Sequence, residues 1–176
     1  MPIEVADYDP AWPAKAAAAI AELTATLPGL FTAIEHIGST SVPGLAAKPV
    51  IDLMAAVAEL DPVLAREQPL IRLRYRRHDG AMAGRLFYLR EENGLRAYHL
   101  HVVPDAGWIT RNERLLRDHL RAHPADAARY AKLKRCLAGR GITPAEYTRA
   151  KTGLIQELTD RARAARGLPR VPVWEE

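Results

Sequence analysis

The chain has 176 residues and a formal net charge of +4. This length suits one domain of ordinary size, which buries enough surface to fold without disulfides. The single cysteine, Cys136, cannot form an internal disulfide, and the sequence contains neither a signal-peptide pattern nor an 18-residue apolar run. These features argue against a secreted or membrane-spanning protein, and we expect a cytoplasmic protein with no membrane partner.

The charge is distributed unevenly along the chain. Residues 1–60 hold 2 basic and 7 acidic side chains, a net of −5, whereas residues 61–176 hold 23 basic and 14 acidic, a net of +9. A basic C-terminal part facing an acidic region suits a polyanionic ligand, although an arginine-rich solvated surface is the alternative interpretation. The 11 aromatic residues form no stacking pattern, which argues against nucleic acid as a partner.

The order of elements predicts an α+β fold with a mixed sheet. An alanine-rich helix starts at Asp9-Pro10 and is stopped by Pro28-Gly29. Two strands are expected at Phe31–Ile37 and Val50–Val57, followed by a helix at Leu60–Leu73. Three further strands are expected at Tyr75–Asp79, Arg85–Arg90 and Arg96–Val103. The last two of these would be joined by a hairpin turn at Asn93-Gly94. Three helices then follow, at about 108–122, 125–140 and 144–165, with Cys136 buried in the second. We therefore expect one domain over residues 1–165, helical from about 108, and a tail at 166–176.

The stretch Glu35–Met54 is the richest in chemistry. Gly38, Ser39, Thr40 and Ser41 form a glycine-hydroxyl turn in which N–H and O–H donors can approach an anion closely. Phosphate is the natural ligand, and a polar capping turn is the alternative. Asp52 follows in an apolar strand, where an ionised carboxylate requires a cation nearby. A bound metal is favoured over an ion pair with Lys48 or an arginine.

The motif residues resemble those of a known family. The run His36-Ile37-Gly38-Ser39-Thr40-Ser41-Val42-Pro43-Gly44-Leu45, then Lys48-Pro49 and Asp52, resembles the signature of the GrpB family, as do His99-Leu100-His101-Val102, Arg117-Asp118-His119-Leu120-Arg121 and Tyr147-Thr148 with Lys151. The resemblance extends over residues 3 to 165. GrpB proteins are in turn similar to DNA-polymerase-beta-like nucleotidyltransferases, marked by Gly-Ser and a later Asp-x-Asp/Glu on a strand. The resemblance implies a nucleotidyltransferase-like mixed sheet with flanking helices and a C-terminal helical segment.

One residue departs from the superfamily pattern. Met54 stands where the second carboxylate of Asp-x-Asp/Glu is expected, and its thioether does not ligate Mg²⁺. His99 and His101 are two apart on a predicted strand and therefore share a face. The fold implied by the resemblance would bring their strand beside the one carrying Asp52. The three residues would then form a catalytic and metal-binding set of two histidines and one carboxylate, which suits Mn²⁺, Fe²⁺ or Zn²⁺ better than Mg²⁺. The alternative is that both histidines hydrogen-bond to a phosphate or carboxylate.

Four cations are candidate phosphate ligands. Lys48, Arg117, Lys134 and Lys151 lie in or near the matching motifs, and Asp118 is placed to orient Arg117. Lys151 follows helical spacing with apolar residues, so its stem should be buried and its ammonium aimed at the sheet. For each of them, a solvated surface position is the alternative.

Three functional hypotheses follow. The first is a nucleotidyltransferase-like enzyme that binds a nucleoside triphosphate and a divalent metal, Mg²⁺ or Mn²⁺ and otherwise Zn²⁺, and transfers a nucleotidyl group to an acceptor. The second is a catalytically silent nucleotide- or anion-binding module that regulates a partner; GrpB-like domains also occur fused behind a coenzyme A biosynthetic kinase. The third is a metal-dependent enzyme acting on a small anionic substrate. No motif specifies the acceptor, the base or the oligomeric state.

Overall fold

The computed structural model describes residues 3–80 and 82–173 of the chain. Its elements, in chain order, are α1 (Trp12–Thr26), β1 (Ala33–Ile37), the short 3-10 helix η1 (Ser39–Ser41), β2 (Ile51–Val57), α2 (Asp61–Leu64), α3 (Glu67–Arg72), β3 (Tyr75–Arg77), β4 (Leu86–Glu92), β5 (Leu95–Pro104), the 3-10 helix η2 (Trp108–Thr110), α4 (Asn112–Ala122), α5 (Pro124–Ala138) and α6 (Pro144–Ala164). In the described part of the chain, no helix is long and apolar enough to cross a membrane.

The strands form one mixed sheet in the order β1-β2-β5-β4-β3. The central pair, β2 and β5, is parallel, and the other three pairs are antiparallel. The predicted hairpin joins β4 to β5, with positive φ at both Asn93 and Gly94, as a tight hairpin turn requires. The expected α+β fold, a mixed sheet with flanking helices, is confirmed.

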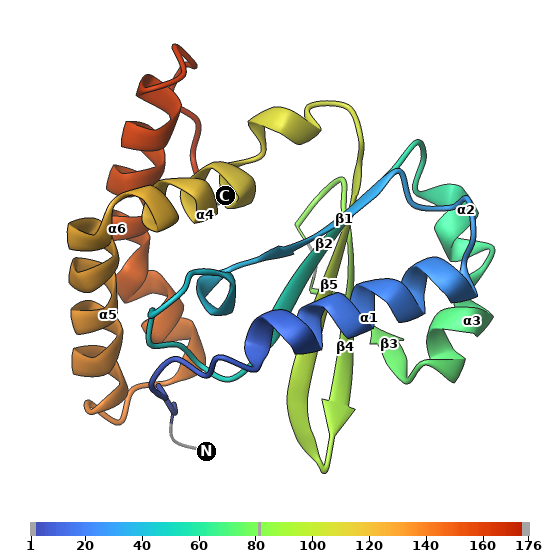
Figure 1. The fold of residues 1–176 in the computed structure, drawn as a ribbon, viewed down its shortest axis with the longest axis horizontal. Helices are drawn as coiled ribbons and strands as arrows, with labels where there is room; N and C mark the ends of the chain where they lie inside the picture. Colours follow the sequence, from blue (N-terminus) through green and yellow to red (C-terminus); the bar gives the residue numbers. More distant parts are fainter. Residues whose placement is uncertain (1–2, 81, 174–176) are drawn as a thin grey trace.

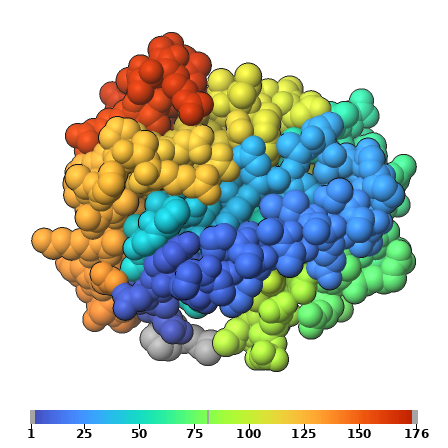
Figure 2. Space-filling model, in the orientation of Figure 1, coloured from blue at the N-terminus to red at the C-terminus, as the bar shows by residue number. Residues whose placement is uncertain are grey.

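The main hydrophobic core lies between one face of the sheet and α1. Trp12 and Leu23 of the helix are buried against Leu53 of β2, Leu100 of β5 and Tyr88 of β4. Figure 1 shows α1 crossing the sheet, and Figure 2 shows that α1 covers this face of the molecule. The alternating residues of β2 and β5 that do not enter this core point to the opposite face.

The helices α4, α5 and α6 gather at one end of the sheet, beside η1 (Figure 1). Their own core includes Leu120, Tyr130, Ile155 and Leu158, and it extends to Val42 just after η1. The segment around η1, cyan in Figure 2, lies between α1 and the C-terminal helices. The glycine-hydroxyl turn therefore sits where the sheet meets the helical part.

Several predicted local structures are wrong. The helix expected at Leu60–Leu73 is divided into α2 and α3, because Arg66 leaves the helical conformation and Pro69 falls in the first turn of the second helix, where its missing N–H costs nothing. The helix expected from 108 begins only at Asn112, after η2 and an extended Arg111. Cys136 is exposed rather than buried.

Candidate functional site

Gly38 ends β1 in a conformation that other residues rarely adopt. Its φ of 72° and ψ of −173° turn the chain into η1, and this region of backbone space is essentially restricted to glycine. A Cβ added here would lie 2.6 Å from Asp52 Oδ2. The glycine therefore allows the turn to lie directly against the Asp52 carboxylate, which explains why these two residue types occur together.

The hydroxyls of the turn have different surroundings. Thr40 and Ser41 are buried; Ser41 Oγ donates to Gly38 O at 2.5 Å, and Thr40 Oγ1 lies 2.8 Å from His36 Nε2. Burial lowers the pKa of His36 to about 4, so this ring is neutral at pH 7 and fixes the turn. Ser39 lines a largely apolar pocket beside Asp52. Of the three hydroxyls, that of Ser39 is the one free of bonds within the turn, among the described residues.

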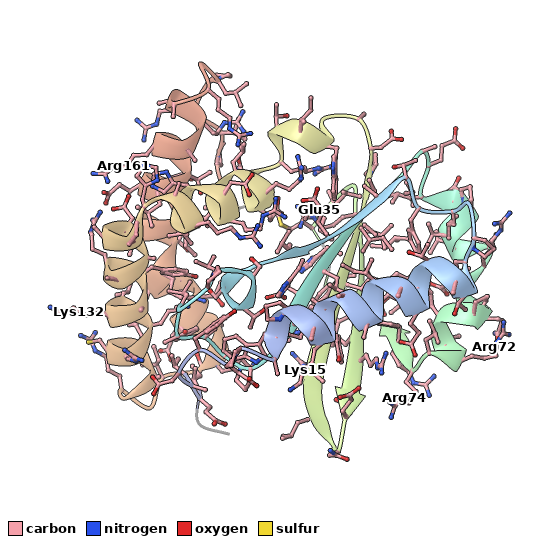
Figure 3. The ribbon with its side chains drawn as sticks, viewed as in Figure 1. Lys15, Glu35, Arg72, Arg74, Lys132 and Arg161 are labelled. Atoms are coloured by element: carbon pink, nitrogen blue, oxygen red, sulfur yellow. The ribbon has the colours of Figure 1, made fainter. Side chains whose placement is uncertain are left out.

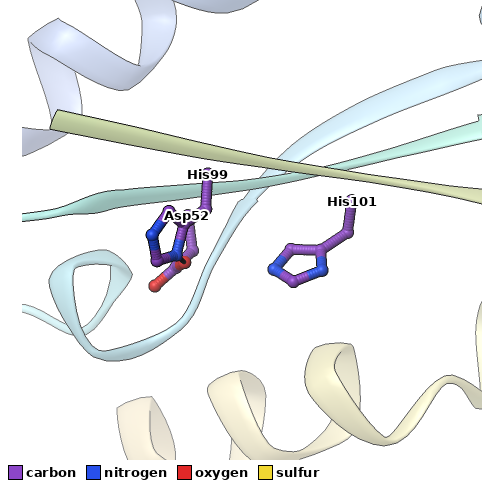
Figure 4. Close-up of side chains that lie close together, drawn as sticks. All are labelled: Asp52, His99 and His101. Carbon is purple, nitrogen blue, oxygen red and sulfur yellow. Dashed lines mark hydrogen bonds and ion pairs between the residues drawn. The ribbon is translucent and has the colours of Figure 1, made fainter. Parts of the chain in front are cut away.

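Asp52 and His99 face each other across the central parallel strand pair. They are register partners, and His99 Nδ1 lies 2.9 Å from Asp52 Oδ1. His101, two residues further along β5, projects from the same face of the sheet (Figure 4). Burial is the largest single influence on Asp52 and opposes its ionisation, but the His99 hydrogen bond and the charges of the neighbouring histidines together outweigh burial, and the pKa of the carboxyl is lowered. The expected two-histidine, one-carboxylate set is thus brought together.

The donor set fits a transition metal. One ligand atom from each of the three residues lies within 4.8 Å of the others. Two ligand atoms on a tetrahedral ion are about 3.4 Å apart, so the side chains would close in on a bound ion. His99 Nε2 and His101 Nδ1 are buried and have no hydrogen-bond partner among the described residues. Imidazole nitrogens with one carboxylate favour Mn²⁺, Fe²⁺ or Zn²⁺.

Met54 borders the site within a small apolar cluster. It is the register partner of His101 and is two residues from Asp52 on the same strand. Its side chain is fully buried with Ile37 and Val103, and Trp108 packs against this cluster. The surroundings of Met54 therefore match its thioether, which does not ligate Mg²⁺.

Two helix lysines form a cationic region on the helical side of Asp52. Lys134 of α5 is 2% exposed, and its Nζ has no hydrogen-bond partner among the described residues. It stands 4.4 Å from the Tyr130 ring centroid, and Tyr130 and Ser39 line the same pocket beside Asp52. Burial, followed by the charge of Lys151, lowers the pKa of Lys134 to about 7. Burial also lowers the pKa of Lys151 to about 8, while the charges of Asp52 and Lys48 act on it in opposite directions.

Arg117 is held in an ion-pair network. Its guanidinium donates to Glu35 at 2.6 Å and to Asp118 at 2.9 Å, and Arg114 makes two further bonds to Glu35 at 2.9 Å each. Glu35 points from β1 toward the helices (Figure 3). Burial alone would raise the pKa of Glu35, but the two arginines lower it. The expected contact between Arg117 and Asp118 is present, and the network fastens α4 to β1.

Glu35 and Tyr130 were not singled out in the sequence. Glu35 is an acid in a mostly apolar strand, shortly before the glycine-hydroxyl turn. An acid in such a strand indicates that a cation or a hydrogen-bond donor contacts it in the fold. Tyr130 precedes Lys134 by four residues and therefore shares its helix face. Both signals become interpretable only once α4 and α5 are placed against β1 and η1.

The sheet and the site together define the class of fold. A mixed sheet carries Gly38-Ser39 at the end of one strand and Asp52 on the next. The fold matches that of the Cid1 poly(U) polymerase with bound MgGTP at a TM-score of 0.52 and 18% identity. The match covers 77% of this chain and 45% of the Cid1 chain. The protein has a nucleotidyltransferase-like fold. The sequence model of the family described as "GrpB protein" matches residues 2–161, and the chain belongs to the GrpB family.

Relatives and a solved structure agree with this assignment. A UPF0157 protein of Pseudomonas aeruginosa is 40% identical over 96% of this chain and 71% of its own length. The Glutamate-rich protein GrpB of Alkalihalophilus pseudofirmus is 30% identical over 71% of this chain and 75% of its own. The crystal structure of a conserved GrpB protein from Enterococcus faecalis matches with a TM-score of 0.85 and 29% identity, over 93% of this chain and 99% of that one. The expected family is confirmed.

Proposed function

We propose that this protein is a metal-dependent nucleotidyltransferase that binds a nucleoside triphosphate beside Asp52. The phosphates would lie between the Gly38-Ser39 turn and the lysines of α5 and α6. The observation that carries the proposal is the buried ammonium of Lys134, which stands over the Tyr130 ring and has no hydrogen-bond partner among the described residues. A buried cation without a partner is costly, and a bound polyanion removes that cost.

The reaction is a displacement at the α-phosphorus. A hydroxyl or amine of the acceptor forms a bond to this phosphorus, the bond to the β-phosphate oxygen breaks, and pyrophosphate leaves while the acceptor releases its proton to solvent. Lys134 and Lys151 would neutralise the charge on the departing pyrophosphate. Ser39 and the backbone of the turn would hold the triphosphate in place. Lys48 is predicted to add a further positive charge at the same end, whereas Arg117, engaged by Glu35, would serve to position the turn.

Asp52, His99 and His101 would hold the divalent metal. When bound, the metal supplies positive charge that offsets the charge developing on the transferring phosphoryl group. Asp52 also contacts Gly38 and so links the metal position to the turn. The two histidines take the place of the absent second carboxylate.

Metal content gives a first test that does not depend on activity. Metal-stripped protein is dialysed against Mn²⁺ or Zn²⁺ and measured by inductively coupled plasma mass spectrometry. We expect about one bound ion per chain in the wild type and loss of most of it in Asp52→Asn and His101→Ala, because each change removes one of three ligands. The exposed residue His78 provides the control, and His78→Ala should retain the ion.

The nucleotide is tested by calorimetric titration of ATP, GTP, CTP and UTP into the same preparations. Micromolar binding that requires metal and is lost in Asp52→Asn supports the proposal. If none of the four triphosphates binds to folded, metal-loaded protein, the proposed function is wrong. A positive metal result without triphosphate binding would favour an enzyme acting on a small anionic substrate.

A catalytically silent nucleotide-binding module is the second candidate. The observation in its favour is Met54, which is buried in an apolar cluster where the wider superfamily has a carboxylate. The two candidates share the binding site and differ in turnover. Triphosphate binding without pyrophosphate release in the presence of acceptors would favour the silent module.

A further inference from the structure

A pocket of ≈310 Å³ opens beside Asp52, at the small end of the range for ligand sites. Its walls come from the sheet and from all three C-terminal helices, and are lined by Phe87, His101, Leu116, Tyr130, Ile155 and Thr159. The phosphate-binding lysines proposed above do not line it. Gly38, Ser39 and Asp52 do line it, so the pocket adjoins the proposed phosphate site and extends it on a largely apolar side.

The charged groups of the pocket are already paired. Arg85 contacts Glu113 at 2.8 Å, and Arg117 contacts Glu35 at 2.6 Å. In the part of the chain that the structure describes, no unpaired lysine or arginine lines the pocket. Apart from a metal held by Asp52 and His101, a phosphate would find no free positive charge among the described residues of the pocket, and the remaining walls suit an uncharged, mostly apolar group.

Two described side chains in the pocket wall have a buried polar atom without a hydrogen-bond partner: His101, assigned above to the metal, and Thr159. Thr159 is fully buried, and its Oγ1 makes no hydrogen bond to any described residue. Buried hydroxyls are usually hydrogen-bonded, so the exception calls for an explanation. A ligand carrying a hydroxyl, amine or carbonyl would supply the partner that the protein does not.

The helix α6 runs along the site, with Lys151 at its cationic end and Thr159 at its apolar end. Lys151, Ile155 and Thr159 are spaced four residues apart and share one helix face, so Thr159 lies about 12 Å along the axis from Lys151. The cationic end is therefore next to Lys151 and the apolar end next to Thr159; Asp52 lines the apolar pocket, and its charge acts on Lys151. In phosphoryl transfer the attacking and leaving groups lie roughly in line on opposite sides of the phosphorus.

We infer that this pocket binds the acceptor, and that the acceptor is a small hydroxyl- or amine-bearing molecule with an aromatic or aliphatic body. The inference depends on the proposed function, because it assumes that pyrophosphate leaves toward Lys134 and Lys151. The size of the pocket and the paired state of its arginines oppose a polynucleotide acceptor, whose backbone phosphates require cations.

The test uses para-fluorophenol and fluorobenzene as probes, observed by fluorine NMR. We expect saturable binding of both probes. In Thr159→Val, the affinity for para-fluorophenol should fall about fivefold, the equivalent of one hydrogen bond, while that for fluorobenzene is unchanged. Leu116→Trp should fill the pocket and abolish binding of both, with the thermal unfolding midpoint as a check on folding.

Competition separates the acceptor role from a nucleobase role. Para-fluorophenol should bind equally well with and without a saturating non-hydrolysable triphosphate analogue. Displacement of the probe by the analogue would overturn the inference, because the base would then occupy the pocket, and so would absence of probe binding in the folded wild type. Failure of the proposed function gives a different result from failure of this inference. If the proposed function is wrong, the triphosphate analogue does not bind at all, while the probe titrations still measure binding to the pocket.

Discussion

Replacing Lys134 by methionine is expected to stabilise the free protein and to weaken triphosphate binding. The methionine keeps most of the aliphatic stem but removes a buried ammonium that has no hydrogen-bond partner among the described residues. We expect the free energy of unfolding at pH 7 to increase by roughly 2–4 kcal/mol. Triphosphate affinity should fall roughly 10- to 100-fold, because a charged hydrogen bond is lost. Urea unfolding and calorimetry provide the two measurements.

The pH dependence gives an independent readout of the same lysine. Its pKa in the folded protein is about 7, below the ordinary value of 10.5. Between these two values the unfolded chain binds more protons, so this lysine makes the wild type more stable as pH rises. The advantage of Lys134→Met should therefore shrink by about 2 kcal/mol between pH 7 and pH 9.

Lys132 offers a matched control on the same helix. It is exposed on the outer side of α5 (Figure 3), and Lys132→Met should change neither stability nor affinity appreciably. If Lys134→Met binds triphosphate as tightly as the wild type, the lysine is a buried structural residue and the cationic region is not the phosphate site. A stability gain that does not change with pH would contradict the assigned titration.

Gly38→Ala is expected to damage the site more than any other single-methyl change. The new Cβ would lie 2.6 Å from Asp52 Oδ2, so the carboxylate or the turn must move. The backbone conformation, with φ of 72° and ψ of −173°, adds roughly 1–3 kcal/mol of strain. We expect loss of metal binding and of triphosphate binding, together with a lower unfolding midpoint.

Gly44→Ala is a control that distinguishes backbone strain from the steric clash expected in Gly38→Ala. It also has a positive φ, of 79°, but a Cβ there would meet nothing within 4 Å. Gly44→Ala should therefore lower stability by about 1 kcal/mol and leave metal content unchanged. If Gly38→Ala retains its metal, Asp52 is not fixed by its contact with the glycine, and the proposed link between the turn and the metal is wrong.

The sheet was largely predictable from local patterns. Alternating apolar residues gave the central strands, and Asn93-Gly94 gave the hairpin, because strand periodicity and turn chemistry are local properties. The shared orientation of His99 and His101 followed from their spacing alone. Their position beside Asp52 did not follow from spacing; it was implied by the family resemblance, and the parallel pairing of β2 with β5 confirms it.

Whether each lysine or arginine has a hydrogen-bond partner could not be predicted from local sequence patterns. Arg117 pairs with Glu35 across 82 positions of sequence, whereas the buried Lys134 has no hydrogen-bond partner among the described residues. Such outcomes depend on contacts between distant segments. Helical periodicity predicted that Lys151 faces inward, but it contained no signal that distinguished the partnered arginine from the unpartnered lysine.

The parallel pairing of β2 with β5 also affects how the chain folds. Asp52 and His99 are 47 residues apart and meet only when the two central strands are joined. A ligand that contacts both residues binds the folded state and not the unfolded chain, so it shifts the folding equilibrium by mass action. During synthesis, such a ligand can bind only after β5 has left the ribosome. Its binding therefore reports that the two central strands have paired.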